Sequence, residues 1–284
     1  MNPHVFDRTV GTGPTLLVTA GVDGDEYAGI EAAMQLIATY EKAPYVGRLI
    51  IVPIVNVSGF VNETSFNPED GKYPKYMGVG KKNGTASQKL MHWLTQSYGV
   101  HADVWMDLHG GSLTEVLTPF VAHWKTGKKD VDARAADIIA HISVEHVLQE
   151  RALLFGSARY LAQQGCAYIL TESGERGERN AKAVAAHIDW VLVAMARLEM
   201  IKYPTRTRAH AVYGSLVEYQ APVDGVWYPS FDRPRKFKQG EMLGIVKTLS
   251  GKQVTIKAKH NCMMLWGKVT ARAKKDEVLI GVGY

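Results

Sequence analysis

The chain has few of the features that mark secreted, membrane-spanning or nucleic-acid-binding proteins. Its 284 residues include only two cysteines, Cys166 and Cys262, which are too few for a disulfide framework. Both lie among apolar residues, where cysteine usually behaves as a small hydrophobic side chain. No apolar run reaches the length of about 18 residues that a membrane-spanning helix needs. Residues 1–4 also lack the basic and apolar regions of a signal peptide. These absences predict a cytoplasmic protein with no membrane partner.

The excess of positive charge is small and dispersed. The formal net charge is +5, and no long basic run is interleaved with aromatic residues. We therefore expect no nucleic-acid partner. The basic residues of the last third are interpreted as a solvated surface, although a mild positive field would favour an anionic substrate. With 46% apolar residues, the chain can bury one large domain, or a large domain and a small one.

Two parts of the chain differ in their hydrophobic pattern. Up to residue 204, apolar runs alternate with segments of helical spacing, which is typical of an α/β layered domain. Beyond it, short β runs are separated by turn residues. We therefore predict an α/β domain over residues 1–204 and a small β domain over residues 205–284. The expected strands are 15–19, 48–55, 103–107, 167–171, 212–219, 243–249, 253–257 and 268–271, and the expected helices are 27–41, 86–98, 130–148 and 180–201.

Two acidic residues follow the first expected strand. Asp23 and Glu26 stand three residues apart in a turn that leads into a helix. Two ionised carboxylates so close repel each other unless a cation or a proton intervenes. The alternative is helix capping, with Asp23 or Asp25 as the N-cap and Glu26 near the positive end of the helix dipole.

A histidine follows the strand at 103–107. Asp107 and His109 are separated by one residue, so strand alternation places both on one side. Asp107 would orient a metal-bound His109 ring, or it would hold a neighbouring loop. A structural role for His109 is the alternative. Together, Asp23, Glu26 and His109 offer an O, O, N donor set that could hold a divalent metal with an open position.

A third carboxylate lies just after the strand at 167–171. Glu172 would be close to the other acidic residues, because strand ends on one sheet edge converge. Beside a metal it would act as the general base, taking a proton from water and returning it to the leaving group. The alternative is an ordinary surface or capping glutamate. Each of the three signals is weak alone, and their convergence at one sheet edge is what indicates a metallohydrolase.

The order of these motifs resembles the succinylglutamate desuccinylase/aspartoacylase family, within the zinc-carboxypeptidase-like fold. The resemblance spans nearly the whole chain, and its main segments are residues 21–26, 67–72, 83–85, 107–109, 156–159 and 171–174. It implies an α/β fold with a mixed sheet, helices on both faces and a small C-terminal β domain. It also implies a metal held by Asp23, Glu26 and His109, with Glu172 as the catalytic general base.

Several positions depart from the family pattern. Asp23 replaces the first histidine ligand, which makes the donor set harder, so that Zn²⁺ is expected and Mn²⁺ or Fe²⁺ would also suit it. Ser65 falls near the arginine that polarises the substrate carbonyl. Lys75 and Tyr76 match an asparagine–arginine pair that grips a substrate carboxylate, and lysine cannot reproduce the bidentate grip of arginine. We expect Lys75 to offer substrate a point charge, and Tyr76 a hydroxyl donor.

These observations predict a metal-dependent deacylase that hydrolyses the N-acyl amide of a small, amino-acid-like substrate with metal-activated water. Two alternatives stay open. One is a binding protein that kept the fold and lost the chemistry, and the other is a carboxypeptidase-like peptidase acting on a peptide tail. The expected partner is a small molecule. The C-terminal domain would shape the entrance or make a subunit contact, so a homo-oligomer is compatible with the sequence.

Overall fold

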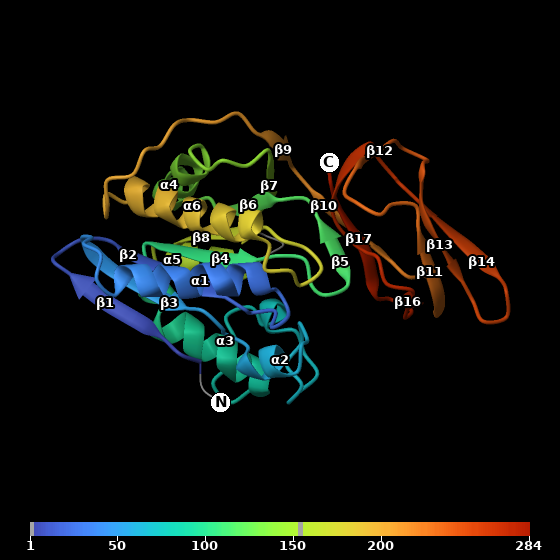
Figure 1. Ribbon diagram of the computed structural model, residues 1–284, viewed down its shortest axis with the longest axis horizontal. Coiled ribbons are helices and arrows are strands. Elements are labelled where there is room, and N and C mark those ends of the chain that lie inside the picture. Colours follow the sequence, from blue (N-terminus) through green and yellow to red (C-terminus); the bar gives the residue numbers. More distant parts are fainter. Residues whose placement is uncertain (1–2, 153–155) are drawn as a thin grey trace.

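An eight-stranded mixed β-sheet organises most of the chain (Figure 1). The computed structural model describes residues 3–152 and 156–284; Met1 and Asn2, part of the N-terminal segment considered above, lie outside them. The strands of this sheet are β1 (Phe6–Val10), β2 (Thr15–Ala20), β3 (Gly47–Val52), β4 (Val104–His109), β6 (Phe120–Lys125), β7 (His146–Arg151), β8 (Ala167–Glu172) and β9 (Ala211–Tyr213). They lie side by side in the order β1-β3-β2-β4-β8-β6-β7-β9.

The four central strands β3, β2, β4 and β8 run parallel to one another. β1 and β6 join them antiparallel, so that the sheet is mixed. Because parallel strands end at the same edge, the segments that follow β2, β4 and β8 meet there. This edge receives Asp23 and Glu26 after β2, His109 at the end of β4 and Glu172 at the end of β8.

Helices cover both faces of the sheet, as the sequence predicts (Figure 1). On one face, α1, α4 and α6 share an apolar core with Leu16 and Val18 of β2. On the other, α3 and α5 share a second core with Leu17, the intervening residue of the same strand. This alternation explains the continuous apolar runs, because each central strand is buried on both sides. The helices are α1 (Tyr27–Tyr40), α2 (Val57–Val61), α3 (Ala86–Ser97), α4 (Lys129–Ile139), α5 (Gly156–Gln163) and α6 (Ala181–Arg197), with short 3₁₀ turns η1 (Pro74–Met77) and η2 (Gly99–His101).

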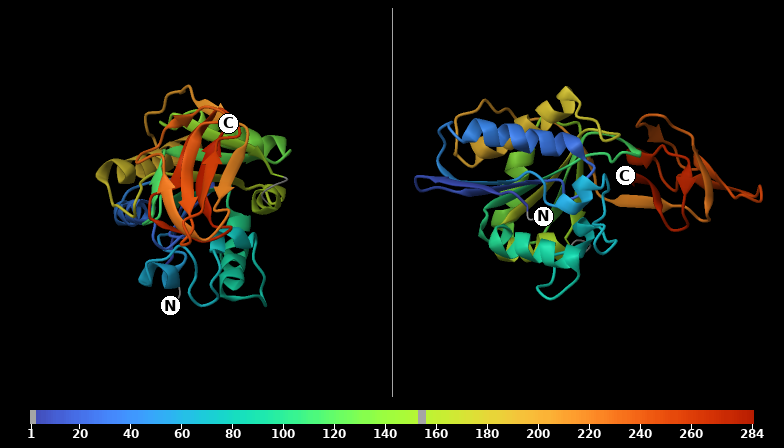
Figure 2. Two further views of the ribbon diagram at one scale, coloured as in Figure 1. Left: turned by 90° about the vertical axis from the view of Figure 1, so that its right-hand side faces the viewer. Right: turned by 60° about the horizontal axis from the view of Figure 1, so that its bottom comes forward.

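The C-terminal strands form two smaller antiparallel sheets with their own apolar core. Figure 2 shows them as an extension beyond one end of the large sheet. The strands are β10 (Leu216–Gln220), β11 (Gly225–Pro229), β12 (Lys236–Phe237), β13 (Met242–Lys247), β14 (Gln253–Lys257), β15 (Cys262–Lys268), β16 (Arg272–Ala273) and β17 (Val278–Gly283). A strand of the first part, β5 (Glu115–Leu117), pairs with β15, whereas β9 stays in the large sheet. The division at residues 204 and 205 stays a prediction.

Some of the expected elements differ from the structure. The helix expected over 130–148 ends at Ile139, and the strand β7 begins at His146, because β-branched residues between them disfavour a helix. The strand expected over 212–219 is divided into β9 and β10, which belong to different sheets. The strand expected over 268–271 is wrong, since β15 ends at Lys268 and β16 begins at Arg272.

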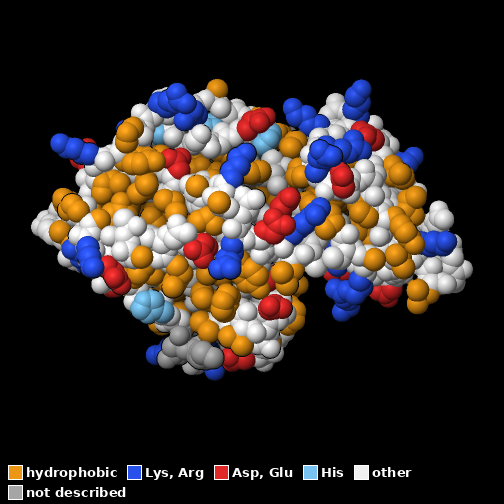
Figure 3. Space-filling model, in the orientation of Figure 1, with side chains coloured by type: hydrophobic (Ala, Val, Ile, Leu, Met, Phe, Trp, Pro, Cys, Tyr) orange, Lys and Arg blue, Asp and Glu red, His pale blue; other side chains and the backbone are white. Residues whose placement is uncertain are grey.

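The surface carries mixed charge on the face shown in Figure 3, where Lys and Arg side chains are interspersed with acidic and apolar ones. Within residues 3–152 and 156–284, no helix is long and apolar enough to cross a membrane.

Helix α1 approaches β4 closely because Gly29 has no side chain. A Cβ placed on Gly29 would lie only 2.8 Å from the carbonyl oxygen of Leu108. This close contact sets the distance between the start of α1, which carries Glu26, and the end of β4, which carries His109.

We expect Gly29→Ala to lower the free energy of unfolding by about 1–2 kcal/mol, because overpacking outweighs the roughly 1 kcal/mol that alanine gains in helix propensity. Chemical denaturation would measure this change. The matched control is Met34→Ala, at a residue on the same helix that is 49% exposed, where the change should stay within about 0.5 kcal/mol. A stabilised Gly29→Ala variant would contradict the proposed packing constraint.

Candidate metal and catalytic site

The structure brings Asp23, Glu26 and His109 together at the carboxyl edge of the parallel strands. Each residue offers one ligand atom, and these three atoms lie within 4.8 Å of one another. All three residues are buried, with exposed fractions of 0, 4 and 2%. The donor set is therefore the O, O, N combination that the sequence predicts, held in a site from which water is largely excluded.

His109 is held from both sides of its ring. Its Nδ1 lies 2.9 Å from Glu26 Oε2 and 3.8 Å from Asp23 Oδ2, and its Nε2 lies 3.1 Å from Asp107 Oδ2. Burial would lower the pKa of His109, but Asp107 and Glu26 outweigh burial and raise it well above its usual value. Asp107 thus orients the ring so that Nδ1 points toward the other two acidic residues.

Asp107 is itself fixed by hydroxyl donors. Thr19 Oγ1 donates to its Oδ1 and Tyr168 Oη donates to its Oδ2, each at 2.6 Å. Trp105 Nε1 in turn donates to Thr19 Oγ1 at 2.7 Å. Burial would raise the pKa of Asp107, but His109 and these hydroxyl donors lower it. Asp107 therefore stays ionised and can accept from His109.

The acidic side chains after β2 do not cap α1. Glu26 occupies the N-cap position, but its side chain makes no capping bond and accepts instead from the Gly110 amide at 3.0 Å. Asp25 Oδ1 accepts from Ser65 Oγ at 2.6 Å. Burial and the neighbouring Asp23 raise the pKa of Glu26 well above its usual value. Asp23 and Asp25 are therefore not the N-cap, whereas Glu26 does lie at the N-terminal end of α1, as the alternative expected. A buried acidic cluster of this kind needs a proton or a cation.

Glu172 lies on the strand next to His109 and faces the same side of the sheet. The two residues are register partners across β4 and β8. Burial raises the pKa of Glu172 to about 7, while His109 and Lys75 act in the opposite direction. Its Oε2 is buried and has no hydrogen-bond partner among the described residues. A carboxylate of this kind can exchange a proton near neutral pH.

Lys75 and Tyr76 lie in η1, on the irregular segment between α2 and α3 that we call the η1 loop. The ammonium of Lys75 contacts Asp23 Oδ2 as an ion pair. Burial would lower the pKa of Lys75, but Asp23 and Glu26 outweigh burial and raise it well above its usual value. Tyr76 is 63% exposed, and its ring centroid lies 5.5 Å from Lys75 Nζ. Lys75 therefore reaches into the site, and Tyr76 stays at its entrance.

These residues fit a divalent metal. Asp23 Oδ1 is buried and, within the described part of the chain, has no hydrogen-bond partner. Such an atom is costly to bury unless a cation or a donor satisfies it. The O, O, N donor set suits Zn²⁺, and its two carboxylates also suit harder ions. Binding through Nδ1 requires that His109 releases the proton that it shares with Glu26.

Three supporting residues were not predicted as parts of the site. Thr19 and Tyr168 fix Asp107. Glu115 on β5 lies close enough to Lys75 to interact with it: burial raises the pKa of Glu115, and the charge of Lys75 offsets part of this rise. Strand alternation could have found Tyr168, which lies four residues before Glu172 on the same face. Glu115 carries no such signal, because β5 leaves the large sheet and pairs with β15.

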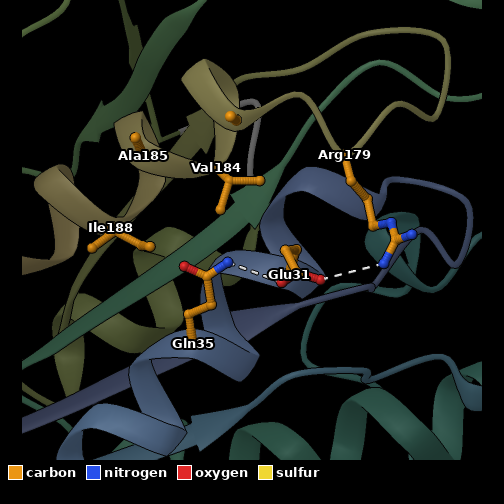
Figure 4. Close-up of a pocket in the computed structure, with 7 residues that line it drawn as sticks. Glu31, Gln35, Arg179, Val184, Ala185 and Ile188 are labelled. Atoms are coloured by element: carbon orange, nitrogen blue, oxygen red, sulfur yellow. Dashed lines mark hydrogen bonds and ion pairs between the residues drawn. The ribbon is translucent and has the colours of Figure 1, made fainter.

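A hollow lies elsewhere, between α1 and α6 (Figure 4). Its volume is about 380 Å³, and none of the residues that line it belongs to the predicted site. Glu31, its acidic residue, accepts a hydrogen bond from Gln35 at 2.9 Å and lies 3.6 Å from Arg179. A much smaller cavity of about 20 Å³ borders Lys75, Asp107 and Tyr168, and it has room for about one water molecule.

Comparison with known proteins identifies the scaffold. Residues 12–197 match the family model of the succinylglutamate desuccinylase/aspartoacylase catalytic domain. The chain belongs to the succinylglutamate desuccinylase/aspartoacylase family. The match includes all the predicted site residues, whereas the strands from β9 onward lie beyond it.

A sequence relative and two solved structures of similar fold agree with this family assignment. The N-alpha-acetyl-L-2,4-diaminobutyric acid deacetylase of Halomonas elongata is 28% identical over 179 residues, which is 62% of this chain and about half (52%) of that protein. The product-bound ectoine utilization protein EutE of Ruegeria pomeroyi superimposes with a TM-score of 0.86 at 22% identity, covering 98% of this chain and 88% of that one. A succinylglutamate desuccinylase/aspartoacylase of Rhodobacter sphaeroides gives 0.84 at 22% identity, covering 99% and 89%.

A buried histidine on α6 supports the end of β8. His187 is fully buried, with Nδ1 3.1 Å from Thr171 Oγ1 and Nε2 3.2 Å from the carbonyl oxygen of Ser173. These two residues flank Glu172. The neutral ring satisfies both contacts, with Nε2–H donating to Ser173 and Nδ1 accepting from Thr171. Burial lowers the pKa of His187 to about 4.

We expect the protein to lose stability as the pH falls from 6.5 toward 4. In this window the unfolded state binds more protons, because the pKa of His187 is 6.5 when unfolded and about 4 when folded. The free energy of unfolding should fall by up to about 3 kcal/mol from this residue. Denaturant titrations at several pH values would measure how steeply the free energy of unfolding changes with pH. This dependence should be shallower for His187→Gln and unchanged for the exposed control His101→Gln. Equal slopes for all three proteins would contradict this assignment.

Proposed function

We propose that this chain is a metal-dependent deacylase that hydrolyses the amide bond of an N-acylated, amino-acid-like small molecule. The observation that carries the proposal is the convergence of Asp23, Glu26 and His109 within 4.8 Å of one another, beside Glu172 on the neighbouring strand. Family membership supports it, and so does a relative that is named as a deacetylase of an acetylated amino acid.

The metal would be held by Asp23, Glu26 and His109. When bound, it would polarise the acyl carbonyl and make water more acidic. The extra negative charge of Asp23, compared with a histidine ligand, should weaken both effects. Asp107 keeps the Nε2 proton of His109 engaged, so that Nδ1 is the nitrogen available as a ligand.

Glu172 would move the proton. It would take a proton from the attacking water and deliver it to the nitrogen of the leaving amine as the C–N bond breaks. A pKa of about 7 suits both halves of this exchange at neutral pH. Gly110 keeps the exit of β4 close to the loop after Glu172, since a Cβ there would lie 2.6 Å from the carbonyl oxygen of Ser173.

Substrate recognition would involve the η1 loop. Tyr76 is exposed at the entrance and would donate its hydroxyl to the substrate. Lys75 would contribute its charge from inside the site, where it contacts Asp23. Neither residue provides the planar pair of donors with which arginine grips a carboxylate. The substrate should therefore differ from a dicarboxylic acyl amino acid that needs such a grip.

A second candidate function is binding without catalysis on the same scaffold. The observation that favours it is the ion pair between Lys75 and Asp23, which satisfies one metal-ligand carboxylate with a side chain. The two functions differ in metal content. Less than about a tenth of an equivalent of metal in the purified protein, even after incubation with Zn²⁺ or Mn²⁺, would exclude the metalloenzyme.

Glu172→Gln should reduce kcat for hydrolysis of N-acetylated amino acids by about 10²–10⁴-fold and leave the metal content unchanged, because the general base is removed and the ligands are kept. Activity assays and metal analysis would be run in parallel on the exposed control Glu178→Gln, which should behave as the natural protein. Loss of metal from Glu172→Gln would show instead that Glu172 is a ligand.

Asp23→His should tighten Zn²⁺ binding, because it restores a neutral nitrogen donor and reduces the repulsion between two carboxylates; we expect about a tenfold change in the dissociation constant. A chelator competition assay would measure this change. An unchanged affinity would place Asp23 outside the metal's ligand set.

A further inference from the structure

The contact between Lys75 and Asp23 joins two of the positions at which this sequence departs from the pattern that the family resemblance implies. Lys75 Nζ lies against Asp23 Oδ2, and the Asp23 side chain is completely buried. The Lys75 ammonium therefore already contacts one oxygen of the Asp23 carboxylate, which is a proposed metal ligand. The other oxygen, Oδ1, has no partner among the described residues.

Residues next to Lys75 in the chain hold its side chain in position. Pro74, at the start of η1, is buried, and its ring fixes the backbone dihedral angle φ just before Lys75. The rings of Tyr73 and Tyr76 lie 6.0 and 5.5 Å from Lys75 Nζ. The Lys75 side chain is 34% exposed, so its stem passes from the surface to the buried carboxylate. The ammonium is thus held at Asp23 and is not a freely mobile surface charge.

We propose that Lys75 is a tethered competitor of the metal: its ammonium neutralises Asp23 in the metal-free protein, and a divalent ion binds Asp23 only by weakening this ion pair. The inference rests on the metal ligands of the proposed function. It assigns Lys75 a role in setting metal affinity, in addition to any contact with substrate.

The charges at the site support this role. Asp23 and Glu26 together balance one divalent cation, and an ammonium at the same carboxylate adds a positive charge that repels that ion. Whether the metal displaces Lys75 or binds Oδ1 beside it, the ammonium opposes the metal. In the metal-free protein the same ammonium is stabilising, because a buried carboxylate without a partner is strongly unfavourable.

The test compares Zn²⁺ affinity in the full-length protein and in Lys75→Gln, by competition with a chromophoric chelator. We expect Lys75→Gln to bind Zn²⁺ at least about tenfold more tightly than the natural protein. The metal-free form of the variant should have a lower melting temperature, and addition of Zn²⁺ should raise that temperature by more than it does in the natural protein. Lys75→Arg keeps the charge and should resemble the natural protein. Lys82→Gln removes an exposed lysine from the same loop and should change neither quantity.

An equal or weaker Zn²⁺ affinity in Lys75→Gln would overturn the inference, and so would a Lys75→Arg variant that binds as tightly as Lys75→Gln. If Lys75→Gln does not fold without metal, Lys75→Met refolded with and without Zn²⁺ supplies the same comparison. Metal bound by Lys75→Gln but not by the natural protein would support the inference and contradict the metal dependence proposed above. If neither the natural protein nor Lys75→Gln binds Zn²⁺, both the inference about Lys75 and the proposed metal dependence would be overturned.

Discussion

The site depends on the balance of buried charge at the ends of three parallel strands. Asp23, Glu26 and Asp107 are almost inaccessible to water, and a buried carboxylate is tolerated only with a cation or hydrogen-bond donors nearby. His109 serves two of them and Lys75 serves the third. The fold thus gathers negative charge at one edge of the sheet, and the cation that balances it decides the chemistry available there.

The departures from the family pattern are related to one another through this balance. Asp23, where the resemblance implies a histidine ligand, adds a negative charge, and Lys75, where it implies an asparagine, supplies a positive one. The structure shows the two in direct contact. By contrast, the residues that orient His109 and carry the proposed base, Asp107 and Glu172, keep the arrangement that the chemistry requires.

Much of the fold could be predicted because the central strands are buried on both faces and therefore read as continuous apolar runs. Strand alternation also placed Asp107 and His109 on one side, and the contact between their side chains agrees with it. The strands β6 and β7, beyond the central four, were harder to predict, since β6 contains a histidine and β7 follows a helix without a clear break. The contribution of Glu115 could not be predicted, because its strand joins a sheet formed by residues about 150 positions later.

The sequence by itself determined the family, the layered fold and the set of polar residues at the strand ends, because these depend on local order and hydrophobic period. Only the tertiary structure decided how those residues are paired. The contact between Lys75 and Asp23 joins side chains 52 residues apart in the sequence, and Lys75 lies on a loop that has no regular hydrophobic pattern. Charge pairing of this kind depends on distances of a few ångströms in a buried site, and such distances are fixed only when the elements pack.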